Sequence, residues 1–268
     1  MPRISLIVIS FILLIYALTG CTPTEETLSS GKTSSSQILK VGITANAPPL
    51  IYKRNNQVTG LEAELAKELA EFAGRELRFV EVKWVDLIPA LISGKIDIIM
   101  SGMSITDLRR MRIEFARPYL VAGQVSLVRR TEYNRFSSGL TDLLKPTVRI
   151  GTVTGTTGDY LVQDKIARTG NMRYKDPQQA VAALIAGKID VFVYDLPMNF
   201  YFAALNESKG LAPVPVPLSR EFLAWGIRKE DTDLLNTANR FIEAQQQTNQ
   251  LQTIVQRWIP YYKNIYNQ

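Results

Sequence analysis

The sequence predicts an α/β protein of two similar lobes, and an internal repeat is the main reason. Residues 90–97 read Ala-Leu-Ile-Ser-Gly-Lys-Ile-Asp, and nearly the same residues return 93 positions later, at 183–190. In each copy a glycine, Gly94 or Gly187, ends a helix-like stretch, where a left-handed backbone suits glycine. An apolar run typical of a buried strand follows. Because two lobes enclose a cleft, we expect a ligand outside the carboxyl ends of these strands.

The first lobe is expected to alternate strands with helices. Leu39–Thr44 and Leu77–Val82 read as strands, and a loop with two prolines follows the first. Between them, Gly60 opens a helix with leucines at helical spacing, and Gly74 ends it. Residues 85–93 form a short helix that leads into the first copy of the repeat. Another long strand, Tyr119–Val128, is expected to cross between the lobes.

The second lobe opens with a strand at Val148–Val153, and the chain then runs through a helix as far as Ala167. Asp176-Pro177 is a cap followed by proline at the first helical position, so a helix leads into the second repeat. Phe222–Ile227 reads as a return strand, and two amphipathic tail helices are expected to pack on the first lobe. The expected boundaries are residues 38–123 and 220–268 for the first lobe and 124–219 for the second.

The N-terminus predicts export and a lipid anchor. Residues 1–20 have a short positive start and an apolar run of signal-peptide length. The run ends in Leu-Thr-Gly before Cys21, which resembles a bacterial lipobox with Cys21 as the acylated residue; the alternative is an ordinary signal with a chance cysteine. Residues 21–37 are polar and read as a flexible tether. We therefore expect an extracytoplasmic protein held to a bacterial membrane by Cys21.

Composition excludes several classes of function. The net charge of +6 is spread along the chain, which disfavours a nucleic-acid surface. The chain has no histidine, and its one cysteine is Cys21, so we expect no intramolecular disulfide and no zinc or iron site. A nucleophile activated by histidine is excluded as well. We expect a monomer with no metal and no cofactor.

Aligning the two repeats brings a candidate ligand site together. Ser101 and Gly102 occupy the positions that Tyr194 and Asp195 occupy in the second copy, so the four residues should face one another across the cleft. The Asp195 carboxylate can accept hydrogen bonds from a cation, and the backbone at Ser101 and Gly102 adds neutral groups. The alternative is that Asp195 only caps the helix that Leu196-Pro197 begins.

An anion subsite is the second candidate. The guanidinium of Arg109 can grip a carboxylate through two parallel bonds, unless it is a solvated surface arginine. Thr156 and Thr157 follow Gly155 at a helix start, where free N–H groups favour anions. Trp84 either stacks on a ligand or fills the core. With Ser104 and Thr157 beside Arg109, the set pairs a carboxylate subsite with an ammonium subsite, as a receptor for a free α-amino acid requires.

Four ordered segments resemble the family 3 solute-binding proteins of amino-acid ABC transporters, over nearly all of residues 38–260. They are Gly60-Leu61-Glu62-Ala63-Glu64-Leu65, Leu91-x-x-Gly94-Lys95-x-Asp97, Ser104-Ile105-Thr106-x-x-Arg109 and Phe115-x-x-Pro118-Tyr119. The resemblance implies a periplasmic-binding-protein-like fold (type II), in which two α/β lobes joined by two hinge strands close on the ligand. The partners it implies are an amino acid and an ABC transporter permease.

The resemblance also assigns roles to residues. It implies that Arg109 clamps the α-carboxylate, helped by Ser104 and by the amide and hydroxyl of Thr157. It implies that Asp195 and the stretch Ser101-Gly102 hold the α-amino group, and that Trp84 stacks on the ligand side chain. Family members often carry an aromatic residue in the loop of residues 46–49, where this chain has Ala47, so one wall of the side-chain pocket is expected to be thin.

Two other functions fit the same fold. Cyclohexadienyl dehydratases remove water and carbon dioxide from prephenate-like acids, and they need a general acid, for which Asp195, Glu62 and Asp86 are the candidates. The third function is an amino-acid-sensing lipoprotein that signals to a partner. The favoured hypothesis is a binding protein without catalysis, because an amine-binding Asp195 favours binding over dehydration.

Overall fold

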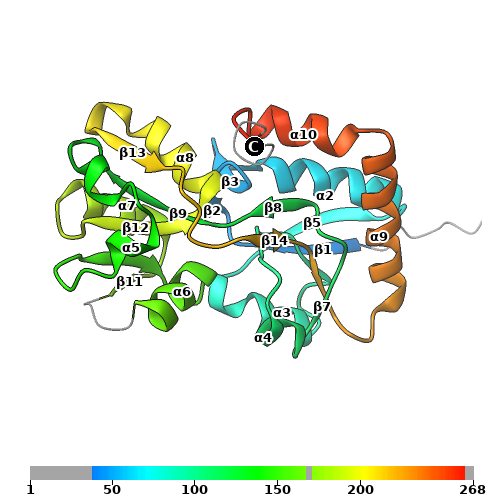
Figure 1. Cartoon of the computed structure of the whole chain (residues 1–268). Helices are drawn as coiled ribbons and strands as arrows, with labels where there is room; N and C mark the ends of the chain where they lie inside the picture. The colour runs from blue at the N-terminus through cyan, green and yellow to red at the C-terminus, as the bar shows by residue number, and fades with distance from the viewer. Residues whose placement is uncertain (1–37, 167–170, 263–268) are drawn as a thin grey trace, which may run out of the picture. The chain divides into compact units, whose positions relative to one another are not determined.

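Two five-stranded sheets carry the repeat, one in each lobe (Figure 1). The computed structural model describes residues 38–166 and 171–262; the predicted signal peptide, Cys21 and the tether lie outside this part of the chain. The first sheet has the order β5 (Glu76–Glu81), β1 (Ile38–Ile43), β6 (Ile98–Ile99), β15 (Gly226–Ile227) and β7 (Glu114–Phe115). The second has the order β11 (Met172–Tyr174), β10 (Ile150–Val153), β12 (Val191–Asp195), β9 (Gln124–Arg129) and β13 (Leu211–Val214).

The two sheets share one layout. In each, three neighbouring strands are parallel (β5-β1-β6 and β11-β10-β12), and the next strand, β15 or β9, is antiparallel to them. The repeat supplies the third parallel strand in both, and Gly94 and Gly187 take the predicted positive φ angles of 74° and 70°. The two-lobed α/β fold predicted from the repeat is confirmed.

Helices cover the first sheet as the leucine spacing predicts. The helix α2 buries Leu61, Leu65 and Leu69, and the tail helices pack against it. Figure 1 shows α2 and the last tail helix on one side of the sheet, the other tail helix along the end of the lobe, and the short helices α3 and α4 on the opposite side. The elements are α2 (Leu61–Phe72), η1 (Trp84–Asp86), α3 (Leu87–Ile92), α4 (Asp107–Arg110), α9 (Thr232–Gln247), α10 (Gln250–Trp258) and a small sheet of β2 (Asn46–Ala47), β3 (Ile51–Arg54) and β4 (Gln57–Thr59).

Two helices of the second lobe begin with side-chain caps. Asp176 accepts a hydrogen bond from the backbone N–H of Gln179, as the Asp-Pro pair predicts, and Thr156 accepts one from Asp159. The buried hydrophobic residues of this lobe include Phe136, Phe192 and the two valines of β12. Its helices are η2 (Arg130–Phe136), α5 (Leu140–Leu143), α6 (Thr157–Lys165), α7 (Pro177–Ile185), α8 (Leu196–Leu205) and η3 (Glu207–Lys209).

Two short antiparallel strands, β8 (Leu120–Ala122) and β14 (Glu221–Leu223), join the lobes. The prediction of one unbroken strand over Tyr119–Val128 is wrong, because the segment is interrupted at Gly123 and its two parts, β8 and β9, belong to different sheets. A Cβ on Gly123 would lie 2.1 Å from the carbonyl oxygen of Ser219, so only glycine fits where the two connections meet. The return strand is likewise interrupted, between β14 and β15. The exact lobe boundaries remain a prediction.

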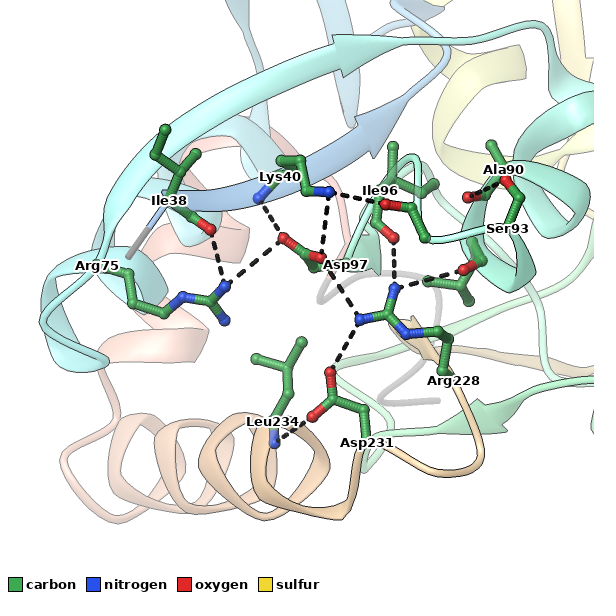
Figure 2. Close-up of polar contacts among 12 residues, drawn as sticks. Ile38, Lys40, Arg75, Ala90, Ser93, Ile96, Asp97, Arg228, Asp231 and Leu234 are labelled. Atoms are coloured by element: carbon green, nitrogen blue, oxygen red, sulfur yellow. Dashed lines mark hydrogen bonds and ion pairs between the residues drawn. The ribbon is translucent and has the colours of Figure 1, made fainter. Parts of the chain in front are cut away.

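The aspartate that closes the first copy of the repeat has a structural role. Figure 2 shows Asp97 beneath the N-terminal end of β1, where its carboxylate accepts a hydrogen bond of 2.9 Å from the backbone N–H of Lys40. The Nη2 atom of Arg228 lies 3.4 Å from Oδ1 of Asp97. The Nη1 atom of Arg228 donates to the carbonyl oxygens of Leu91 and Ile96. One arginine thus joins the end of α3 to the start of β6.

The second copy repeats this arrangement. Asp190 accepts a hydrogen bond of 2.9 Å from the backbone N–H of Arg149, and Arg129 donates from Nη1 to the carbonyl oxygens of Leu184 and Ile189, both at 2.7 Å. Each arginine belongs to the antiparallel strand beside the repeat or follows it directly. The residues shared by the two copies of the repeat therefore specify the same helix-to-strand junction in both lobes.

Replacing Asp190 by asparagine is expected to lower the free energy of unfolding by about 2 kcal/mol at pH 7, because hydrogen bonds to a buried carboxylate are lost. Burial opposes ionisation, but hydrogen bonds and charge from Arg149 outweigh it and lower the pKa of Asp190. A depressed folded-state pKa gives stability that is present above the unfolded value near 4 and is lost as pH falls. The difference from wild type should therefore shrink toward pH 3.

Urea unfolding of both proteins at several pH values measures this effect. Asp164→Asn is the control, because Asp164 is exposed and, among the residues that the structure describes, forms an ion pair with the neighbouring Lys165 alone. Ligand affinity should stay unchanged, since Asp190 lies outside the pocket described below. A full difference in stability that persists at pH 3 would contradict the prediction.

Candidate ligand-binding site

A pocket between the lobes brings the sequence-predicted residues together. It is lined from the first lobe by Thr44, Asn46, Ala47, Trp84, Ser101, Gly102, Ser104 and Arg109, and from the second by Val153, Thr156, Thr157, Lys175, Pro177, Tyr194, Asp195 and Met198. All eight residues predicted to bind a ligand are in this set. Both copies of the repeat point their strand ends into it, as expected for α/β lobes.

Arg109 is buried, with 7% of its surface exposed, so the alternative of a solvated surface arginine is wrong. It lies on α4, where Nη1 donates to the carbonyl oxygen of Ser104 at 2.7 Å and Nη2 to that of Gly155 at 3.4 Å. Within the described chain, no carboxylate lies within 4.0 Å of its guanidinium nitrogens. Burial lowers the pKa of Arg109, and a buried cation without a carboxylate partner in the described chain favours an anionic ligand.

Asp195 ends β12 with 6% of its surface exposed. It occupies the residue before α8, yet its side chain makes no capping bond, so the alternative of a purely capping aspartate is wrong. Instead, Oδ1 accepts a hydrogen bond of 3.0 Å from Nε2 of Gln124. Burial, and next the charge of Glu221, raise the pKa of Asp195 to about 8. A cation placed beside it would favour the ionised form.

The side chains of Thr156 and Thr157 have different partners. The hydroxyl of Thr156 donates to the carbonyl oxygen of Val153 and accepts from the N–H of Asp159, so it is used in capping. Thr157 begins α6, where its backbone N–H has no intrahelical acceptor and can face an anion. Its hydroxyl donates to Glu221 at 2.7 Å, and the hydroxyl of Ser104 donates to the same carboxylate at 2.6 Å.

Trp84 contacts Arg109 of its own lobe and Gly155 of the second lobe. Its ring centre is 5.3 Å from the guanidinium carbon of Arg109, and its Nε1 donates to the carbonyl oxygen of Gly155 at 3.0 Å. The indole is half-buried, and Trp84 is among the residues that line the pocket. Ala47 also lines the pocket, and no aromatic ring occupies its position. Stacking of Trp84 on a ligand side chain remains a prediction.

Glu62 holds the backbone of Gly102, which lines the pocket. It is fully buried on α2; its carboxylate accepts hydrogen bonds from the backbone N–H of Gly102 and, at 2.8 Å, from the hydroxyl of Tyr119. Gly102 has a positive φ of 67° and lines the pocket. Burial raises the pKa of Glu62 to about 7. Sequence reasoning named Glu62 only as a candidate acid, but both oxygens are held by the fold, away from the pocket lining.

Replacing Glu62 by alanine is expected to cost about 3 kcal/mol of stability, because the buried N–H of Gly102 loses its acceptor. Glu62→Gln keeps an acceptor of the same size and should cost less than half as much. The alanine variant should also bind ligand more weakly, since the Gly102 backbone is then free to move. Thermal unfolding and titration of both variants check this, and equal stability losses would contradict it.

Two further residues near the site were missed by sequence reasoning. Nε2 of Gln124 donates hydrogen bonds to Oδ1 of Asp195 at 3.0 Å and to the hydroxyl of Thr157 at 3.1 Å. The carboxylate of Glu221 accepts hydrogen bonds from the hydroxyls of Thr157 and Ser104. Both belong to the segments that connect the lobes. Gln124 lies inside the predicted crossing strand and Glu221 directly precedes the predicted return strand, but nothing in the sequence around either residue marks it as part of a site.

The family profile of the bacterial extracellular solute-binding proteins, family 3, matches residues 39–261. The chain belongs to this family. A protein of Campylobacter jejuni named "Probable histidine-binding protein" is 33% identical over 190 residues, which cover 70% of this chain and 72% of the relative. ABC transporter arginine-binding protein 1 of Escherichia coli is 28% identical over 231 residues, covering 85% and 93%.

A solved structure carries the same likeness. The ancestral amino-acid-binding protein AncCDT-1, described as a precursor of cyclohexadienyl dehydratase, superposes with a TM-score of 0.76 at 31% identity. The match covers 83% of this chain and 95% of that chain. In this chain, none of the helices that the structure describes is long and apolar enough to cross a membrane.

Proposed function

We propose that this solute-binding protein is a receptor for a free α-amino acid, which it holds between its lobes. The observation that carries the proposal is a buried arginine and a buried aspartic acid in one pocket, Arg109 and Asp195. Neither has an ion-pair partner among the residues that the structure describes. A zwitterion with a carboxylate at Arg109 and an ammonium at Asp195 satisfies both.

These two side chains also explain how the pocket can hold a ligand without a covalent bond. An isolated buried charge is costly, whereas a charge that is paired and hydrogen-bonded is not. The ligand therefore completes the pocket. The carboxylate receives two N–H bonds from Arg109 and further donation from the N–H at the start of α6. On the other side, the ammonium donates to Asp195 and to backbone carbonyls near Ser101.

The wider role follows from the family and from the N-terminus. The relatives include proteins named for binding histidine and arginine, the latter an ABC transporter component. We infer that this chain also hands its amino acid to a membrane permease. The signal peptide at 1–20 and acylation of Cys21 would hold it at the outer side of a bacterial membrane, as a monomer on the tether 21–37.

Thermal unfolding of the purified protein against the common L-amino acids and prephenate tests the proposal. A ligand present at a hundred times its dissociation constant stabilises the protein by about 2.7 kcal/mol, which shifts the midpoint by a few degrees at this chain length. We expect a shift from one group of amino acids. A panel in which no amino acid shifts the midpoint would refute the assignment of Arg109 and Asp195.

One observation favours a second function, an enzyme that dehydrates prephenate-like acids. The raised pKa of Asp195, about 8, keeps a proton donor in the pocket at neutral pH. Glu62 and Asp86, the other candidate acids, are absent from the pocket lining. Incubation with prephenate, followed by ultraviolet detection of the aromatic product, separates the two functions. We expect no turnover and no stabilisation by prephenate.

A further inference from the structure

Glu221 stands at the first residue of β14, where the two connections between the lobes run side by side. Its backbone pairs with Ala122 of β8, and its side chain is half-buried. The carboxylate accepts three hydrogen bonds from hydroxyl groups. Ser219 donates to Oε1 at 2.6 Å, Ser104 donates to Oε2 at 2.6 Å, and Thr157 donates to Oε2 at 2.7 Å. Bonds of this length to an ionised oxygen are of the strong, charge-assisted kind.

The donors come from different lobes. Ser104 lies beyond β6 in the first lobe and forms a bridge to Leu223, and Thr157 begins α6 in the second. One oxygen atom therefore holds both lobes. Gln124 extends the connection, since its Nε2 donates to the Thr157 hydroxyl and to Asp195. A continuous chain of hydrogen bonds thus runs from Ser104 to Asp195 beneath the pocket.

This arrangement fixes where the hydroxyl protons point. A serine or threonine hydroxyl has one proton to donate. Because Ser104 and Thr157 both donate to Glu221, neither hydroxyl has a proton left for a ligand carboxylate while these bonds persist. Arg109 and backbone N–H groups then supply the donors on the anion side. Moving the lobes apart must break at least one of the two bonds to Oε2.

We propose that Glu221 is a positioning residue that fastens the two lobes together from outside the pocket. It is absent from the pocket lining, so it acts through Ser104 and Thr157 rather than on the ligand. The fastened arrangement is the one in which residues of both lobes line one pocket. Glu221 therefore raises affinity for every ligand of the site by the same factor; this last step rests on the proposed function.

Glu221→Gln tests the proposal, because glutamine keeps the shape and removes the charge. X-ray scattering of the ligand-free protein is the first measurement, with Glu230→Gln, a change at an exposed carboxylate nearby, as the matched control. We expect the Glu221 variant to have a larger radius of gyration than wild type and control. This readout needs no ligand, so it decides the fastening role even if no amino acid binds. An unchanged radius would overturn the proposal.

Titration is the second measurement. It compares the amino acid that stabilises the protein with its deaminated and decarboxylated analogues. Affinity for all three should fall by a common factor on the order of tenfold, since only the population of the binding-competent form changes. Selective loss for one analogue would instead make Glu221 a direct ligand contact and overturn the proposal.

A further variant guards against misfolding of the first. Thr157→Val removes the hydroxyl of the second lobe and leaves the backbone N–H of α6 in place. It should expand the ligand-free protein as Glu221→Gln does, and the double variant should expand it little further, because both changes break the same connection. Independent, additive effects of the two changes would contradict a shared link.

Discussion

Replacing Arg109 by lysine is expected to weaken ligand binding by roughly 30-fold, or about 2 kcal/mol. The positive charge is retained, so the loss measures geometry. Lysine offers a point charge in place of two parallel N–H donors, and it loses the hydrogen bonds that Arg109 makes to the carbonyl oxygens of Ser104 and Gly155. Those bonds fix the guanidinium in place before the ligand arrives.

Titration calorimetry with the amino acid and with its decarboxylated amine measures this effect. The loss should be large for the amino acid and small for the amine, which has no carboxylate to grip. Arg112→Lys is the matched control, because Arg112 follows the same helix but is exposed and outside the pocket lining. Affinity of the Arg109 variant within a few-fold of wild type would argue against the carboxylate assignment.

The repeat made the fold and half of the site predictable. Its glycines and apolar runs fix two equivalent helix-to-strand junctions, and the strand that follows each junction ends at the cleft. Ser101, Gly102 and Asp195 could therefore be placed opposite one another from spacing alone, because parallel strands of an α/β sheet end at the same edge. Arg109, Ser104 and Trp84 were candidates from their residue types, and the resemblance to the family assigned their roles.

Other features depend on contacts between distant segments. Gly123 breaks the predicted crossing strand because it meets Ser219 of the other connection, 96 residues later in the sequence. Whether Arg109 is buried or solvated depends on Trp84 and on Gly155 of the opposite lobe. Neither Glu221 nor Gln124 could be predicted from neighbouring residues, because their hydrogen-bond partners lie far away in the sequence and meet only in the folded protein.

Replacing Asp195 by asparagine is expected to weaken binding of an ammonium-bearing ligand by about 100-fold, or about 3 kcal/mol, because the buried ammonium loses its counter-charge. A deaminated analogue of the same ligand should bind the variant nearly as well as it binds wild type. Asparagine retains the hydrogen bond with Gln124, so the fold around the pocket should persist. Equal losses for both ligands would make Asp195 a structural residue instead.

The pH dependence gives an independent check on the same carboxyl. Burial raises the pKa of Asp195 to about 8 from its ordinary 3.8 in the ligand-free protein. A folded-state pKa above the unfolded value contributes stability that is complete below about pH 4 and is lost as pH rises through 8. Above pH 8 without ligand, the asparagine variant should therefore be at least as stable as wild type.

Binding of the ammonium ligand reverses this balance, because the ammonium requires the ionised carboxylate. Below pH 8 the protein must release a proton on binding, so affinity should rise by up to about tenfold per pH unit until pH 8 is reached. Calorimetry at pH 7 in buffers of different ionisation enthalpy counts that proton directly. We expect close to one proton released by wild type and none by Asp195→Asn. Proton release that is the same in both proteins would assign the titration to another group.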